Sequence, residues 1–175
     1  ENNLFENVKR TAILISVIED AEILNNKFYN FERDAIRVDG GYNSGYLVID
    51  GNEFVCEEPD LAHNGIYFRS LGSSKDSESP HVVFVRNNYF KNLGIPATVY
   101  SGAISSSSYQ EFGLTIEVIS NTFETCANYI MLRNNATEAN HSAYKWDGKI
   151  NYNVFLGEPL AYYYINHTGD ELIVT

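Results

Sequence analysis

A short pattern of apolar and polar positions recurs along the chain: an aliphatic residue, two further residues, asparagine, one residue and phenylalanine. Val118, Asn121 and Phe123 form one copy. The steps between the asparagines of successive copies are 23, 26, 36, 33 and 32 residues. Recurrence at a period of about 20 to 50 residues predicts a repeat architecture. The asparagines are Asn3, Asn26, Asn52, Asn88, Asn121 and Asn153.

The residues around each asparagine have the pattern of β-strands. Apolar side chains before it are spaced by two, as in Leu47 and Ile49, which places both on one face of a strand. The aliphatic lead-in residues are β-branched, which suits a pleated, half-buried surface. A second apolar run follows in several copies and predicts a second strand. These runs are Ile36 to Val38, Ile66 to Phe68, Ile130 to Leu132 and Tyr162 to Tyr164.

Short strands at a repeated step, without Asn-Gly hairpin signals, favour a coil whose turns stack about 4.8 Å apart. Like residues then lie above like residues. We therefore expect the asparagines to form a hydrogen-bonded ladder at one corner, because a buried amide needs partners. The phenylalanines should stack inside. This pattern predicts an all-β fold, the parallel β-helix, with no helix.

With its Asn-x-Phe repeat and coils of more than twenty residues, the whole chain resembles the pectin-lyase-like superfamily. The resemblance implies a right-handed parallel β-helix, a solenoid of about five to six coils. Members of that superfamily include pectate lyases, polygalacturonases, chondroitinase B, alginate lyases, phage tailspikes and surface proteins. Because one fold carries many functions, the resemblance implies no single activity.

Residues 1–175 are expected to form a single β-helix domain that is a fragment of a longer protein, because the chain begins inside a repeat and shows no end cap. Longer insertions interrupt the repeats at one phase and should lie on one edge. This edge either carries a binding face or merely tolerates insertion. The insertions are Gly40 to Gly45, Ser70 to Pro80, Ser101 to Gly113 and Asn134 to Gly148.

The net charge of −11 argues against nucleic acid or an anionic membrane surface as a partner. It also disfavours capture of a polyanion unless calcium or a local basic patch intervenes. No run approaches the roughly 18 apolar residues that membrane insertion requires. The acidity can equally serve solubility.

Outward positions on the second strands predict a lengthwise stripe of tyrosine and arginine. Aromatic rings pack against the C–H face of a sugar, and charged groups bind its hydroxyls. Tyrosine is also common on strands for structural reasons. Trp146 can wall such a groove or cover the core of its own loop. The candidate substrate-binding residues are Arg37, Asp39, Tyr67, Arg69, Tyr100, Arg133, Trp146 and Tyr163, and Met131 falls in the same stripe.

No catalytic set is recognisable, so the catalytic residues stay unknown. The Gly-His-Gly and Arg-Ile-Lys motifs of polygalacturonases are absent. Calcium is possible as a cofactor, but no clear site supports it, because Asp34, Asp39 and Asp50 fall at different phases of the coil. The chondroitinase B and alginate lyase family uses a lysine and an arginine on adjoining coils. Arg69 and Arg133 with Lys91 or Lys145 are the residues of this chain that could take those roles. Basic residues on a strand are more commonly solvated.

Two acidic segments, Glu57-Glu58 and Glu32-Arg33-Asp34, are interpreted as turn residues facing water. The four histidines share no spacing typical of metal ligands. Cys56 and Cys126 are expected to stay unpaired. They occupy different positions relative to the ladder asparagines of their repeats, and one whole coil lies between their two coils.

The function hypothesis is an extracellular or cell-surface module that binds or helps to process a polysaccharide or glycan surface through the stripe and the edge loops. If the protein is an enzyme, it should be a polysaccharide lyase or a glycoside hydrolase. The alternative is a structural spacer or adhesin segment of a larger surface protein, without a catalytic site of its own.

Overall fold

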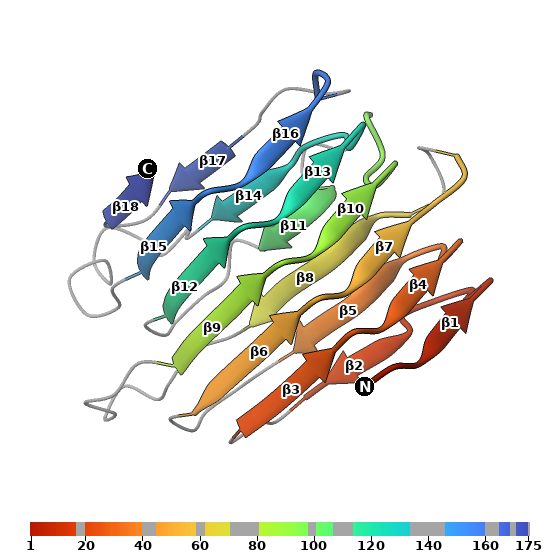
Figure 1. The fold of residues 1–175 in the computed structure, drawn as a ribbon, viewed down its shortest axis with the longest axis horizontal. Helices are drawn as coiled ribbons and strands as arrows, with labels where there is room; N and C mark the ends of the chain where they lie inside the picture. The colour runs from red at the N-terminus through yellow and green to blue at the C-terminus, as the bar shows by residue number, and fades with distance from the viewer. Residues whose placement is uncertain are drawn as a thin grey trace.

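The computed structural model describes residues 1–16, 20–39, 45–58, 62–70, 81–97, 101–106, 114–133, 146–159, 165–168 and 171–174. Within these ranges the chain is all-β, and its strands form three parallel sheets of six strands each (Figure 1). Every third strand joins the same sheet, so each sheet is built from one strand of every repeat. This arrangement is consistent with a parallel β-helix, as the periodicity predicted.

Sheet 1 carries the phenylalanines. Its strands, in spatial order, are β1 (Leu4–Glu6), β4 (Lys27–Tyr29), β7 (Glu53–Val55), β10 (Tyr89–Lys91), β13 (Thr122–Glu124) and β16 (Val154–Leu156). Sheet 2 contains β2 (Ile13–Ile15), β5 (Asp34–Asp39), β8 (Asn64–Ser70), β11 (Gly102–Ser106), β14 (Ile130–Arg133) and β17 (Ile165–Thr168). Sheet 3 contains β3 (Asp20–Leu24), β6 (Tyr46–Asp50), β9 (His81–Arg86), β12 (Leu114–Ile119), β15 (Trp146–Asn151) and β18 (Glu171–Val174).

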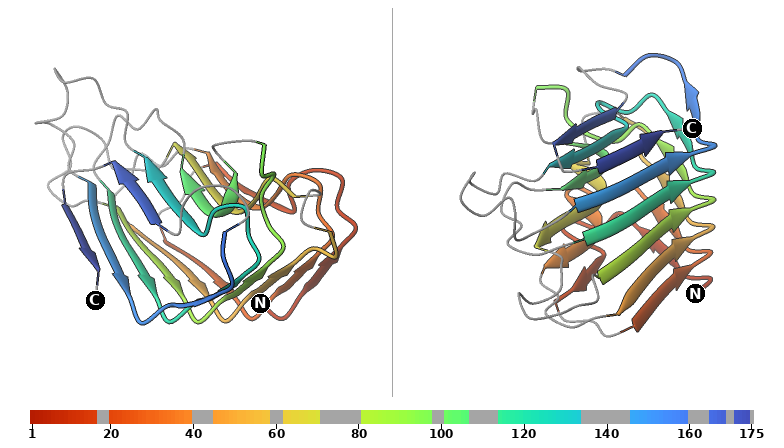
Figure 2. Two further views of the ribbon diagram at one scale, coloured as in Figure 1. Left: turned by 90° about the horizontal axis from the view of Figure 1, so that it is seen from above. Right: turned by 90° about the vertical axis from the view of Figure 1, so that its left-hand side faces the viewer.

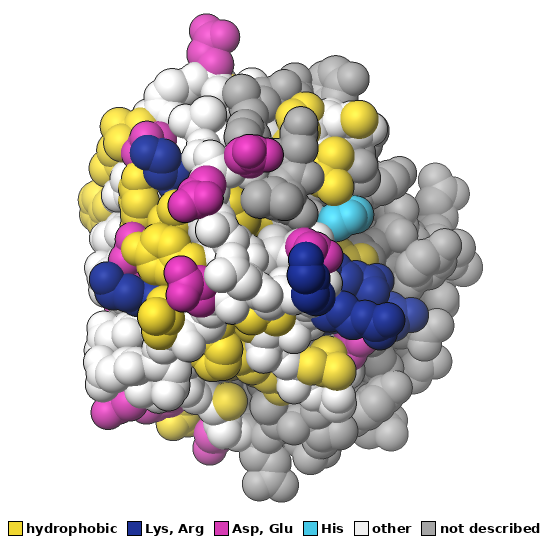
Figure 3. All heavy atoms as spheres, turned by 90° about the vertical axis from the view of Figure 1, so that its right-hand side faces the viewer, with side chains coloured by type: hydrophobic (Ala, Val, Ile, Leu, Met, Phe, Trp, Pro, Cys, Tyr) yellow, Lys and Arg dark blue, Asp and Glu magenta, His cyan; other side chains and the backbone are white. Residues whose placement is uncertain are grey.

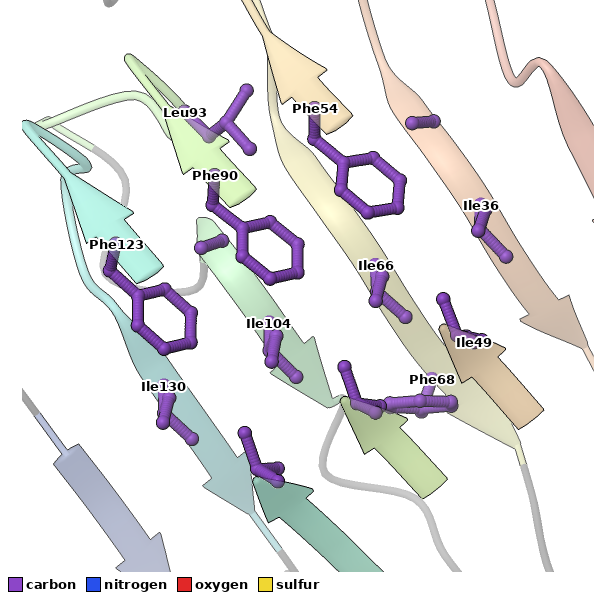
Figure 4. Packing of buried hydrophobic residues seen from close by; sticks show 14 of the residues in the cluster. Ile36, Ile49, Phe54, Ile66, Phe68, Phe90, Leu93, Ile104, Phe123 and Ile130 are labelled. Carbon is purple, nitrogen blue, oxygen red and sulfur yellow. The ribbon is translucent and has the colours of Figure 1, made fainter. Parts of the chain in front are cut away.

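The repeated phenylalanines form the aromatic centre of the core. Phe28, Phe54, Phe90 and Phe123 are fully buried. The centroids of neighbouring rings lie 4.8 to 5.0 Å apart and the rings are nearly parallel, which matches the spacing of adjacent strands. Figure 4 shows three of these rings in one row beside isoleucines from sheet 2. The predicted phenylalanine stack is confirmed, and it extends to Phe155, whose ring lies 5.3 Å from that of Phe123.

The predicted asparagine ladder is also confirmed. In each step, the side-chain oxygen of one asparagine accepts hydrogen bonds from the backbone N–H and the amide nitrogen of the asparagine before it. Asn88, for example, accepts from Asn52 at 2.8 and 3.0 Å and donates to Ile49 O at 2.9 Å. The same pattern runs from Asn3 to Asn153. A buried amide is satisfied only when the coils above and below are in register.

The corner that carries the ladder has a constant length. Two residues separate each strand of sheet 3 from the next strand of sheet 1, and the second is always the ladder asparagine. The first residue adopts a left-handed backbone conformation, for which Gly and Asn are well suited. These first residues are Asn25, Gly51, Asn87, Ser120 and Tyr152.

The connections from sheet 2 to sheet 3 all lie at one corner of the stack (Figure 2). They vary most in length, from two residues between β17 and β18 to twelve between β14 and β15, whereas those from sheet 1 to sheet 2 vary from four to ten residues. The bounds of three expected insertions were wrong. Gly102–Ser106 forms β11, Trp146 begins β15, and Ser70 ends β8. β11 escaped notice because it is built mostly from small residues. The close approach of the turn before β14 explains Gly102, because a Cβ there would lie 2.4 Å from Asn128 O. Most of the inserted residues lie outside the described part of the chain.

The predicted second strand at Tyr162 to Tyr164 falls outside the described residues. In the described part of the chain, the strand that pairs with β14 is β17 (Ile165–Thr168). Cys56 and Cys126 are both buried free thiols, as expected from their phases.

Candidate functional site

The outward row along sheet 2 differs in part from the predicted stripe. Arg37 and Tyr67 are aligned neighbours, as expected. Ser105 follows in the position predicted for Tyr100, then Met131, and then Asn166 instead of Tyr163. Ser105 and Met131 are fully buried. In the described residues the predicted exposed strip is therefore interrupted at Ser105 and Met131, whereas Tyr67 on β8 is partly exposed.

Four of the predicted site residues lie together on β5 and β8. Arg37 Nε donates to Asp39 Oδ1 at 2.8 Å, and Arg69 Nη1 lies 3.4 Å from Asp39 Oδ2. The guanidinium carbon of Arg37 lies 5.5 Å from the centre of the Tyr67 ring, within the range of a cation–π contact. The hydrogen bond with Asp39 is the largest cause of the raised pKa of Arg37. Arg37 is thereby fixed as a permanent cation against an aromatic ring.

A β-bulge positions Arg69. Val38 pairs with Phe68, but Asp39 pairs with Ser70, so Arg69 is the extra residue on β8. A bulge bends its strand and redirects a side chain. Here it leaves the Arg69 side chain 59% exposed, while it still reaches Asp39.

Asp34 is the functional candidate that sequence reasoning missed. It was interpreted as a turn residue facing water, but it begins β5 and is only 2% exposed. Its Oδ1 accepts a hydrogen bond of 2.8 Å from Asn64 Nδ2. Its Oδ2 lies 3.7 Å from Arg37 Nη1 and 4.0 Å from Arg33 Nε, beyond hydrogen-bond distance. Burial raises the pKa of Asp34, although Asn64 and the nearby cations oppose the shift.

A sequence signal for Asp34 does exist. Asp34 stands two residues before a core isoleucine, and Asn64 and Asn128 occupy the same position in later repeats. Asn64 and Asn128 are buried and hydrogen-bonded. Asp34 thus belongs to a second, shorter row of polar side chains. Where the asparagines of this row carry an amide NH2, Asp34 carries a second carboxyl oxygen.

The side chains enclose an open cavity of about 390 Å³, whose lining residues are Arg33, Asp34, Arg37, His63, Asn64, Tyr67 and Arg69. Figure 3 shows basic side chains (dark blue) gathered on one face near a histidine (cyan). His63 is exposed, and its backbone N–H donates to Arg33 O. Arg33 also has a largely exposed side chain.

The cavity is a basic site on an acidic protein. Three arginines face one buried carboxyl, and Asp39 pairs with two of these arginines from the side. The more exposed guanidiniums, those of Arg33 and Arg69, can bind an anionic group bidentately. Tyr67 offers a half-buried ring and Asp34 offers an acceptor or, when protonated, a donor. The arrangement can therefore bind a ligand that carries an anion, hydroxyls and an apolar face.

The other predicted site residues do not join this cavity in the described structure. Tyr100 and Tyr163 lie outside the described ranges. Arg133 ends β14, two strands from β8, and its side chain is not described. Trp146 begins β15 in sheet 3, whereas it was expected within the insertion Asn134 to Gly148.

Within the described ranges, no group of three or more His, Cys, Asp or Glu side chains is arranged to hold a metal ion. The same part of the chain has no helix long and apolar enough to cross a membrane. Comparison with protein-family models, with curated proteins and with solved structures finds no match for this chain.

Proposed function

We propose that this protein binds an acidic polysaccharide through the cavity on β5 and β8. One observation carries the proposal: a chain of net charge −11 concentrates three arginines and a histidine around one cavity that also contains a tyrosine ring. Such a local basic patch is the feature that capture of a polyanion by an acidic protein requires.

The proposed binding mode assigns each side chain a role. Arg33 and Arg69 bind the anionic group of one sugar unit, and Tyr67 packs against the C–H face of that unit or its neighbour. Arg37 does not bind directly in this mode. Its hydrogen bond with Asp39 and its contact with Tyr67 hold those two side chains in place. Asp34 accepts a hydrogen bond from a sugar hydroxyl at the floor of the cavity.

We further propose that the fold is right-handed, with about five to six coils, and that the protein is related in architecture to the pectin-lyase-like superfamily. Residues 1–175 would then be one domain that acts outside the cell or at its surface, without nucleic-acid or membrane partners. The repeat pattern and the three parallel sheets support this proposal. If the site is also catalytic, elimination or hydrolysis of a glycosidic bond is the reaction that fits a polysaccharide ligand.

Isothermal titration calorimetry with matched saccharides tests the proposed function. Oligogalacturonate and oligoalginate serve as acidic probes, and dextran of similar length serves as the neutral probe. We expect the acidic probes to bind and the affinity to fall with added salt, because screening weakens exposed charges. Tyr67→Ala and Arg69→Gln should each weaken binding by about tenfold or more.

Arg86→Gln is the matched control. Arg86 is similarly exposed and also pairs with an aspartate, Asp50, but it belongs to sheet 3 and not to the cavity. Equal losses in Arg69→Gln and Arg86→Gln would show a general charge effect and contradict the assigned site. Binding of dextran alone would contradict the acidic ligand.

A structural spacer or adhesin segment is the second candidate function. The observation that favours it is the continuity of the stack: the asparagine ladder and the phenylalanine stack run through all six strands of sheet 1. Failure of every saccharide to bind, with the fold intact, would favour this function.

A further inference from the structure

The two oxygen atoms of the Asp34 carboxyl have different surroundings. Oδ1 accepts a hydrogen bond of 2.8 Å from Asn64 Nδ2. The orientation of that amide is fixed, because Asn64 Oδ1 in turn accepts from the backbone N–H of Gly102 at 3.2 Å. Oδ2 receives no hydrogen bond from the described residues, although Asp34 is only 2% exposed and lines the cavity. A change in the hydrogen bonding of Asp34 is therefore confined to Oδ2.

Two arginines of the cavity lie beside Oδ2 without donating a hydrogen bond to it. Arg37 Nη1 is 3.7 Å away and Arg33 Nε is 4.0 Å away, both beyond hydrogen-bond distance. Arg37 is held in this position by its hydrogen bond of 2.8 Å with Asp39. Oδ2 therefore faces positive charge and keeps room for a partner from a bound ligand.

The charged groups that act on the Asp34 carboxyl in the described structure are cations. They are Arg37, Arg33 and, when it is protonated, His63. In the coil before β5, Lys9 pairs with Glu32 and not with Asp34. The other charged or titratable groups around this coil are Arg10, Asp39, Tyr67 and Arg69.

The row to which Asp34 belongs shows that its position does not require a charge. Asn64 and Asn128 occupy the same position in later repeats and are buried. An Asp34 carboxyl that is protonated on Oδ2 has the layout of asparagine, with an acceptor toward Asn64 and a donor toward the arginines. Burial raises the pKa of Asp34, which favours this neutral form, although Asn64 and the cations oppose the shift. Both protonation states are therefore compatible with the fold.

We infer that binding of an anionic sugar unit in the cavity is coupled to the uptake of a proton from solvent by Asp34 Oδ2. The inference rests on the proposed function, in which Arg33 and Arg69 hold the anion. An anion on Arg33 lies close to the ionised Oδ2, and neighbouring negative charges repel each other. The proton removes this repulsion. It also changes Oδ2 from an acceptor into a donor, which can bond to the anion or to a sugar hydroxyl.

The direction of the pH dependence follows from this coupling. A bound anion raises the pKa of Asp34 above the value that burial already sets in the free protein. Between the pKa of the free protein and that of the complex, binding takes up as much as one proton. Well above both values Asp34 stays ionised, and the affinity is lowest. The affinity rises as the pH falls through this window, until Asp34 is protonated with and without ligand.

Isothermal titration calorimetry with oligogalacturonate tests the inference, in two buffers of different ionisation enthalpy at several values from about pH 4.5 to about pH 7.5. The difference between the two buffers gives the number of protons taken up. The natural sequence should take up more protons than Asp34→Asn, and the excess should fall as the pH rises. At the highest pH, Asp34→Asn should bind about tenfold or more tightly than the natural sequence. Protons exchanged by the saccharide itself are the same for both proteins.

Asp50→Asn is the matched control, because it removes the same charge from sheet 3, away from the cavity. The Asp50 carboxylate accepts hydrogen bonds of 2.7 Å from Arg86 and 2.9 Å from Asn87. Asp50→Asn should keep the proton uptake of the natural sequence. Histidine side chains commonly change charge between about pH 5 and 8, so the excess uptake should also persist when His63→Gln is added to both proteins.

A second measurement on the natural sequence does not depend on the folding of a variant. The titration midpoint of the Asp34 carboxyl, followed by carbon-13 nuclear magnetic resonance, should rise when oligogalacturonate is added. An unchanged midpoint, equal proton uptake in Asp34→Asn and the natural sequence, or equal tightening by Asp34→Asn and Asp50→Asn overturns the inference while the saccharide still binds. Absence of binding by every acidic saccharide instead contradicts the proposed function, and the inference with it.

Discussion

Replacing Asn88 with alanine tests the ladder at a buried position in the middle of the stack. The Asn88 side chain takes part in four hydrogen bonds, two accepted from Asn52 and one donated to each of Ile49 O and Asn121 Oδ1. Asn88 and the neighbouring ladder residue Asn52 are each only 2% exposed. Alanine leaves the N–H of Asn52 without an acceptor and Ile49 O without this donor, in a place where water cannot easily replace them.

The magnitude follows from those two groups. A buried polar group that loses its partner costs about 1 to 3 kcal/mol. With two backbone groups affected, Asn88→Ala should lower the free energy of unfolding by about 3 to 5 kcal/mol. Asn3→Ala removes the amide hydrogen bonds to Asn26 Oδ1 and Glu1 O at the exposed end of the ladder, where water can replace the lost donor. Its cost should be only about 1 kcal/mol.

Urea unfolding followed by far-ultraviolet circular dichroism measures both variants. The midpoints report stability if the slopes of the two transitions match that of the natural sequence. Equal costs for the two substitutions, or a cost for Asn88→Ala within about 0.5 kcal/mol of zero, would refute the argument that buried amide hydrogen bonds hold the coils in register.

Three further predictions concern the core, the cavity and the thiols. Phe90→Ala should cost about 3 to 5 kcal/mol in the same urea assay, and the end residue Phe5 should cost less, because its ring has one stacking neighbour. Asp34→Asn should be more stable than the natural sequence at neutral pH. The pKa of Asp34 is raised in the folded protein, so the natural sequence loses stability as the pH rises through that folded pKa. Urea unfolding at several pH values should show the difference vanish below the ordinary carboxyl pKa of about 3.9. Thiol titration should detect two free thiols after denaturation without reductant, while burial, which raises the pKa values of Cys56 and Cys126, should make the native protein unreactive; a count of zero after denaturation would contradict the coil order.

Sequence reasoning predicted the fold well wherever a side chain has to match its neighbour in the next coil. Asn88 and Phe90 recur because a ladder amide and a stacked ring tolerate no substitute without loss of register. β11 was missed because its residues are mostly small: Gly102 packs closely against Asn128 in the turn before β14, and no alternating apolar pattern is left to detect. The residue aligned with Met131 was missed for a similar reason: tyrosine suits a strand in many settings and does not define a phase, so Tyr163 was predicted where the structure aligns Asn166.

The candidate site was predicted in part for the same physical reason. Counting outward positions brought Arg37 and Tyr67 together, because register fixes which residues are neighbours. The burial of Met131 was not predictable from a strand pattern, which defines which face a residue occupies but not what covers that face. The role of Asp34 depends on a second polar row, in which an acidic residue substitutes for asparagine, and a search for phenylalanine repeats does not detect it.

The constant two-residue corner beside the ladder has a consequence for how this fold can change. One residue added there would turn every following side chain of the strand to the opposite face and place phenylalanines in water. Between sheets 2 and 3 the connections already vary from two to twelve residues, and between sheets 1 and 2 they vary from four to ten. Insertions and deletions should therefore avoid the ladder corner and accumulate most readily at the corner between sheets 2 and 3. A protein engineer could graft binding loops at that corner while keeping every residue of the ladder corner unchanged.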